Sequence, residues 1–241
     1  MNIPMPTEAE KKESISYIKK EGLERKDNLF TAVVRVYREI GMRNIFFGVA
    51  DCIYIALVIA LAAFGFAFSL NSDELRCAVS LVSPLFFIAA QYLTVWKDSM
   101  TGTYEVKAAC KYKPSHITAF RMLFFSTVSI ALDVPASYVA AKLTGNGFLG
   151  ILLISFFALF VYSLAMVLIM ICIKNRAAEY ILPGLWVSLH IIPFFKGSEW
   201  LATVNVLESG AGVALCVICA LFYVAALDFL VKKGERKYAY R

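Results

Sequence analysis

Residues 148–173 read FLGILLISFFALFVYSLAMVLIMICI and contain no charged side chain. An apolar run of this length can cross the roughly 30 Å hydrocarbon core of a bilayer as one α-helix. Turn-forming residues precede it at Thr144-Gly145-Asn146-Gly147, and the basic group Lys174-Asn175-Arg176 closes it. The run therefore predicts a transmembrane helix with a turn before it and a basic end after it.

The rest of the chain has the same character. Of its 241 residues, 60% are apolar, and the mean hydropathy is +0.68, which is too apolar for one soluble core. We expect further spans over residues 45–70, 77–96, 122–141 and 210–231, and a short, kinked one over residues 180–195. The sixteen-residue segment 180–195 would cover only about 24 Å, so residues 200–207 are expected to dip back into the membrane beside it. The predicted fold is all-α, a polytopic membrane protein with six transmembrane helices.

The first 43 residues differ from the remainder. Residues 1–26 are polar and mixed in charge, which predicts a solvated, partly helical tail. Apolar residues then recur at helical spacing over residues 27–43, opposite a basic face. This pattern predicts an amphipathic helix lying on the membrane surface, with a packed cytosolic helix as the alternative. The chain thus divides into residues 1–43, a cytosolic tail with an interfacial helix, and residues 44–241, a membrane domain.

Charge predicts the orientation of the spans. All but three of the 24 lysines and arginines fall in the two termini or in the segments 97–121 and 174–180. The three exceptions are Arg76, Lys142 and Lys196. The positive-inside rule therefore places both termini and the segment 97–121 in the cytosol. Because this asymmetry accounts for the net charge of +6, no nucleic-acid partner is expected.

Motifs for catalysis or for nucleotide binding are absent from the sequence. There is no G-x-x-x-x-G-K-[ST] phosphate loop, no H-E-x-x-H pair and no G-x-S-x-G elbow. The two histidines, His116 and His190, are far apart in sequence, and Cys216-Val-Ile-Cys219 lies within a span, where packing is its expected role. We expect no enzyme activity, no catalytic residue, no metal and no cofactor.

The segment 97–121 is the longest polar interruption between apolar segments. Gly102 permits a backbone turn where the preceding span leaves the membrane, and Thr101 or Thr103 can cap a following helix. Glu105 near the start of that helix is favoured by the helix dipole. A short helix over residues 103–111 would present Tyr104 to the cytosol. The same helix would also present Lys107 and Lys111 to the cytosol.

This segment resembles the cytosolic loop after the second span of type-two ABC transporter permeases. Thr101-Gly102-Thr103-Tyr104-Glu105 is similar to the G-T-x-E core of that loop, Lys113-Pro114 falls where the pattern often has proline, and Arg121 stands where a basic residue opens the third span. The remaining layout agrees, with an amphipathic N-terminal helix, six spans and a short fifth span before a re-entrant segment.

The resemblance implies a permease subunit of an ABC transporter, an exporter in a bacterial plasma membrane. It implies a homodimer or a pairing with a second permease, driven by a separate ATP-binding cassette ATPase. That ATPase would dock on the loop through Thr101, Gly102, Thr103, Tyr104, Glu105, Lys107 and Lys111. The loop sequence alone leaves one alternative open: a capped surface helix with no docking role would contain the same residues.

Three polar residues within spans are candidates for a translocation path. Asp133 is a carboxyl group close to the middle of the span 122–141, which we expect to be interrupted at Asp133 and Pro135. An ionisable group at that depth is a functional candidate. It can be protonated, paired with His190 or Lys142, or turned toward a polar path. Gln91 and His190 are the other two candidates. If Asp133 is the coupling site, the chain is instead a proton- or ion-coupled secondary carrier, and a third alternative is a non-transporting sensor or immunity protein.

Overall fold

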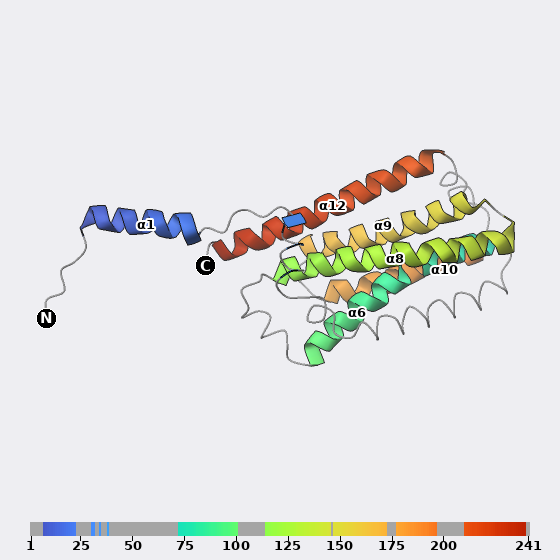
Figure 1. Cartoon of the computed structure of the whole chain (residues 1–241). Helices are drawn as coiled ribbons and strands as arrows, with labels where there is room; N and C mark the ends of the chain where they lie inside the picture. The colour runs from blue at the N-terminus through green and yellow to red at the C-terminus, as the bar shows by residue number, and fades with distance from the viewer. Residues whose placement is uncertain are drawn as a thin grey trace.

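A computed structural model describes residues 7–22, 30, 31, 34, 38, 72–100, 114–145, 147–172, 177–196 and 210–239. The regular structure of these residues is entirely α-helical (Figure 1). The helices are α1 (Glu8–Gly22), α5 (Ser72–Val82), α6 (Leu85–Met100), α8 (Pro114–Thr144), α9 (Phe148–Cys172), α10 (Ala177–Lys196) and α12 (Gly210–Ala239).

Four segments of this structure are long and apolar enough to cross a membrane. They are Arg76–Thr94, His116–Leu143, Phe148–Cys172 and Gly210–Lys233. These helices are consistent with the expected multi-pass membrane protein. The predicted fifth span lies within α10, and Ile181–His190 is an apolar stretch of it among the residues whose side chains the structure describes. The predicted first span, 45–70, and the segment 200–207 lie outside the described residues, so four of the six predicted spans have a counterpart here.

The N-terminal region contains a capped helix. Thr7 and Glu10 bond reciprocally at the start of α1: the Glu10 N–H donates to Thr7 Oγ1 at 3.4 Å, and the Thr7 N–H donates to Glu10 Oε2 at 2.7 Å. These bonds hold the pKa of Glu10 below its usual value. Of the predicted helix over residues 27–43, the structure describes Phe30, Thr31, Val34 and Arg38. All four are helical and exposed, while the complete amphipathic helix stays a prediction.

The membrane helices pack around α9. This helix contacts α12, α8, α5 and α10, and α6 packs along α8. The side chains of α9 that face these neighbours are buried, and the core they share includes Phe87, Phe125, Tyr162 and Leu227. The C-terminal ends of α6, α9 and α12 lie with the N-terminal end of α8 at one end of the bundle (Figure 1).

The turn that precedes α9 is where the sequence predicts it. Gly145 has a φ of 70°, a left-handed conformation that suits glycine at the end of a helix, and its N–H donates to the carbonyl of Ala141 at 3.0 Å. The carbonyl of Gly147 accepts from the N–H of Gly150 at 3.1 Å and so begins α9. The short connection makes α8 and α9 antiparallel neighbours.

Two spans differ from their predicted form. The span predicted over residues 77–96 is divided by a turn at Ser83 and Pro84, which separates α5 from α6. The span predicted to be interrupted at Asp133 and Pro135 is continuous, because α8 runs from Pro114 to Thr144. Transmembrane helices tolerate proline where neighbouring groups compensate for the missing N–H donor, so Pro135 does not end α8.

Helix α12 is held to α9 on one side and exposed on the other. The Cys216 thiol donates to the carbonyl of Leu153 at 3.4 Å, and the Lys233 ammonium donates to the carbonyl of Ile171 at 2.5 Å. Only 17% of its membrane-length segment is buried in the structure, against at least 50% for the other three, so its outer face suits contact with lipid. Lys232 forms an ion pair with Asp228, one turn before it on the same helix.

Replacing Lys233 with methionine is expected to lower the free energy of unfolding by about 0.5–1 kcal/mol. The substitution removes a charged donor from the last turn of α9, where carbonyl groups lack intrahelical partners and the helix dipole favours a cation. Reversible unfolding in mixed micelles measures the change. Lys12→Met, an exposed lysine of α1, is the matched control and should leave stability unchanged. Equal effects of the two substitutions would contradict a role for the contact between α12 and α9.

Candidate functional site

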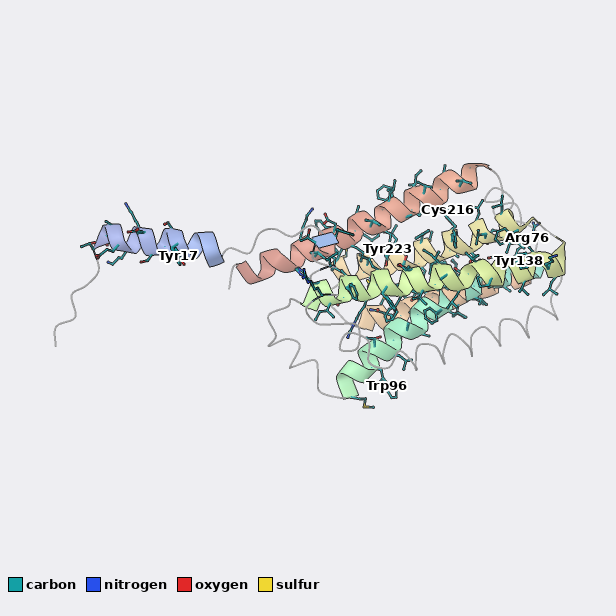
Figure 2. All side chains as sticks on the ribbon, viewed as in Figure 1. Tyr17, Arg76, Trp96, Tyr138, Cys216 and Tyr223 are labelled. Carbon is teal, nitrogen blue, oxygen red and sulfur yellow. The ribbon has the colours of Figure 1, made fainter. Side chains whose placement is uncertain are left out.

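The break between α5 and α6 creates an irregular point within a span. Pro84 has no N–H, so the carbonyl of Ser80 loses the backbone donor that a continuous helix would provide. The helical pattern resumes when the N–H of Ile88 donates to the carbonyl of Pro84 at 2.9 Å. Arg76 and Trp96 mark the two ends of the divided span (Figure 2). Irregular backbone at membrane depth is tolerated where protein covers it or where it lines a path.

Asp133 lies against this break. The hydroxyl oxygen of Ser83 is 2.6 Å from Asp133 Oδ2 and 2.9 Å from the carbonyl oxygen of Ser155 on α9. The side chain of Ser155 also interacts with the carboxyl group. Ser83, Asp133 and Ser155 are here called the Asp133 cluster. All three side chains are buried, and Asp133 is only 7% exposed. The cluster joins the α5–α6 break to α8 and α9.

More hydroxyl groups follow the same face of α8. Ser129 and Ser137 lie one turn before and one turn after Asp133, and residues four apart share a helix face. Each is 1% exposed, and the hydroxyl oxygen of each has no hydrogen-bond partner among the described residues. Two turns before Asp133, Ser126 accepts from the Tyr223 hydroxyl of α12 at 3.5 Å. The interior of the bundle therefore contains a polar strip on α8.

A second group of buried side chains is aromatic. The ring of Tyr162 packs edge-on against the rings of Phe87 and Trp186, with distances between ring centroids of 6.1 Å and 5.5 Å. The ring centroids of Trp186 and His190 are 4.4 Å apart. His190 Nδ1 is 2.9 Å from the carbonyl oxygen of Trp186. Phe87, Tyr162, Trp186 and His190 are here called the aromatic row, which connects α6, α9 and α10.

The three predicted path residues do not meet at one point. His190 ends the aromatic row, and Asp133 belongs to the Asp133 cluster. Gln91 is buried one turn after Phe87, and its Oε1 atom has no hydrogen-bond partner in the described part of the chain. The predicted pairing of Asp133 with His190 or Lys142 is not seen among these residues, since serines contact the carboxyl group and Lys142 lies 5.8 Å from the centre of the Tyr138 ring.

The predicted ATPase-coupling residues Thr101, Gly102, Thr103, Tyr104, Glu105, Lys107 and Lys111 lie outside the described residues. The structure does fix both flanks of this segment. Helix α6 continues to Met100, and α8 begins at Pro114, earlier than the predicted start of its span at Met122. Residues 101–113, between these two bounds, lie outside the described residues, and Arg121 belongs to α8, where it is buried.

Sequence reasoning named Asp133 and missed the residues around it. Ser129, Asp133 and Ser137 recur at a spacing of four, and a polar strip on a membrane helix is visible from that spacing. Ser83 stands directly before a proline inside an apolar run, which signals a possible break. Ser155 gave no such signal because one serine in a long apolar helix is common. Only its contact with the other two residues distinguishes it.

Comparisons with protein-family models, with curated proteins and with solved structures find no match for this chain.

Proposed function

We propose that this chain is the membrane permease subunit of an ABC transporter, an exporter of the bacterial plasma membrane with both termini in the cytosol. It works as a homodimer or with a second permease and is driven by a separate ATPase. The ATPase docks on the cytosolic loop at residues 97–121, through Thr101 to Glu105 with Lys107 and Lys111. The resemblance of Thr101-Gly102-Thr103-Tyr104-Glu105 to the coupling loop of type-two permeases supports this proposal.

One structural observation carries the proposal further. Residues 101–113 connect α6 to α8, and these two helices pack against each other. The Asp133 cluster links α8 to the turn from which α6 starts. A force applied to the connecting segment would therefore act on both helices and on the break in the span. Such a segment can transmit a push from an ATPase to the interior of the membrane domain.

The docking role of the loop is tested by co-expression with the ATPase encoded beside this chain. The two proteins should purify as a complex, and Glu105→Ala or Tyr104→Ala should weaken it by about tenfold, equivalent to roughly 1.4 kcal/mol of binding free energy. Transport should fall while ATP hydrolysis continues. Glu13→Ala, which removes an exposed carboxylate from α1, is the matched control and should leave binding intact.

A second candidate function has its own observation. Asp133 is buried at a broken helix, and broken helices with buried ionisable groups occur at the coupling sites of secondary carriers. A proton- or ion-coupled carrier would purify alone and transport in response to a proton gradient. Loss of that transport in Asp133→Asn, with no ATPase present, would replace the ABC proposal with this one.

A further inference from the structure

The hydroxyl group of Ser83 stands between two acceptors. Its oxygen is 2.6 Å from Asp133 Oδ2 and 2.9 Å from the carbonyl oxygen of Ser155, and both distances are those of hydrogen bonds. The 2.6 Å distance fits a neutral or an ionised carboxyl group. The number of hydrogens available in the cluster therefore decides between the two forms.

A serine hydroxyl has one hydrogen, and both a carboxylate and a carbonyl oxygen only accept. If Asp133 were ionised, the two close contacts of Ser83 would have to share the one hydroxyl hydrogen. If Asp133 carries a proton, the carboxyl group donates to Ser83 Oγ and the Ser83 hydroxyl donates to Ser155. Only the protonated form gives each of the two contacts a hydrogen of its own.

The charges around Asp133 agree with this form. The helices that pack against α8 are α5, α6, α9 and α12. The titratable side chains within the membrane-length segments of these helices and of α8 itself are Arg76, Cys77, Tyr92, His116, Arg121, Tyr138, Lys142, Tyr162, Cys172, Cys216, Cys219, Tyr223, Asp228, Lys232 and Lys233. None of them is hydrogen-bonded or ion-paired to Asp133, whose contacts within the described residues are Ser83 and Ser155. A carboxylate without a cation at this depth is costly.

We propose that the Asp133 cluster is a proton-binding site, with the proton held on the Asp133 carboxyl group between α8 and the α5–α6 break. The ligand of this site is a proton. The site does not depend on the energy source of transport, so it is tested independently of the ATPase proposal.

Two further hydroxyl groups allow the proton to leave. Ser129 and Ser137 lie one turn on either side of Asp133, buried and without hydrogen-bond partners among the described residues. They make no hydrogen bond to Asp133 while its carboxyl group is neutral. When it ionises, they can turn to donate to the carboxylate, which prefers several donors. The site can therefore hold both protonation states.

Release of the proton also changes what holds the broken span. In the neutral state the Ser83 hydroxyl bonds to the carbonyl of Ser155 and ties the break to α9. In the ionised state the Ser83 hydrogen is attracted to the carboxylate, and the bond to α9 is lost. The hydrogen bond of Ser83 then goes to α8, while the packing of α5 against α9 remains. Protonation of Asp133 thus controls the hydrogen bond between the broken span and α9.

Infrared spectroscopy of the full chain in lipid nanodiscs tests the site. A protonated-carboxyl C=O band should be present at about pH 6, where an exposed aspartic acid is ionised, and absent in Asp133→Asn. Asp228→Asn, which alters a carboxylate already paired with Lys232, is the matched control and should keep the band. Absence of an Asp133-dependent band at this pH would overturn the proposal. A band that sodium abolishes at constant pH would also overturn it, because the site would then bind a metal cation.

The role of the Ser129 and Ser137 hydroxyl groups is tested by the pH dependence of the same infrared band. In Ser129→Ala/Ser137→Ala the ionised state loses two donors while the neutral state loses none, so the band should persist to a pH about one to two units higher. Ser188→Ala on α10 removes an exposed hydroxyl that bonds within its own helix and should cause no shift. An unchanged midpoint in the double variant, with the folded spectrum retained, would contradict the release mechanism.

Discussion

Replacing Tyr162 with alanine is expected to lower the free energy of unfolding by about 2–4 kcal/mol. Tyr162 is 1% exposed, and its ring joins Phe87 of α6 to Trp186 of α10. Its removal leaves a cavity where three helices meet. Because lipid is as apolar as the interior, the loss is one of packing rather than of transfer from water, which places the effect below the largest values seen in soluble cores. Reversible unfolding in mixed micelles measures it.

Two controls define this result. Tyr162→Phe keeps both ring contacts and should cost less than about 1 kcal/mol. Phe222→Ala removes an aromatic ring from the outer face of α12, where the side chain is 63% exposed, and should change stability by less than about 0.5 kcal/mol. If Phe222→Ala lowered the free energy of unfolding as much as Tyr162→Ala, the contacts of the aromatic row would not be what stabilises the bundle. The loss of any aromatic ring would then have the same effect.

The helices that the sequence predicts best are those with the strongest apolar signal. The observed α9 covers residues 148–172 of the predicted span 148–173, and α12 begins at Gly210 as expected. Length and hydropathy decide such helices, because every backbone group in the hydrocarbon region must bond within its own helix. The segment 180–195 has a weaker apolar signal because it is short and contains two prolines, and it lies within α10.

Proline positions were predicted poorly, and in opposite directions. Pro135 was expected to interrupt its span but lies inside α8, whereas Pro84 was not singled out and marks a break. The two residues have the same local chemistry, since each removes one donor from the helix. The difference is tertiary, because the turn beside Pro84 is supported by the bonds of Ser83 to α8 and α9. Sequence alone does not contain that support.

The candidate site was predicted in part for the same reason. A carboxyl group within a span is conspicuous in a sequence, so Asp133 was identified, and so was its possible protonation. Its partners Ser83 and Ser155 come from the α5–α6 turn and from α9, and a serine is unremarkable in either place. Gln91 and His190 were also conspicuous, yet the structure places His190 in the aromatic row instead. Polarity predicts which residues need partners, while the packing of helices determines which partners they find.

Substitutions of Asp133 should separate by chemistry rather than by size. Asparagine has the shape of a neutral aspartic acid, and its amide can donate to Ser83 as the protonated carboxyl group does, so Asp133→Asn should change the free energy of unfolding by less than about 1 kcal/mol. Asp133→Ala removes the donor and leaves a cavity beside Ser83, at a cost of about 1–3 kcal/mol. Asp133→Lys places a charge within the span without a partner and should cost about 3 kcal/mol or more.

The order of these three variants tests the protonation state independently of spectroscopy. If Asp133 were a carboxylate, its hydrogen bonds would be charge-assisted. The neutral Oδ1 of asparagine would accept them much more weakly, which would bring the loss in Asp133→Asn close to that in Asp133→Ala. Near-equal losses in the asparagine and alanine variants would thus contradict a neutral Asp133. Unfolding measured at several pH values strengthens the comparison, because a neutral aspartic acid predicts that wild type and Asp133→Asn have similar stability at low pH. As the pH rises, wild type should become less stable relative to Asp133→Asn. Its unfolded state releases the Asp133 proton to solvent, whereas the folded state must keep the proton or ionise within the bundle, and asparagine has no such proton.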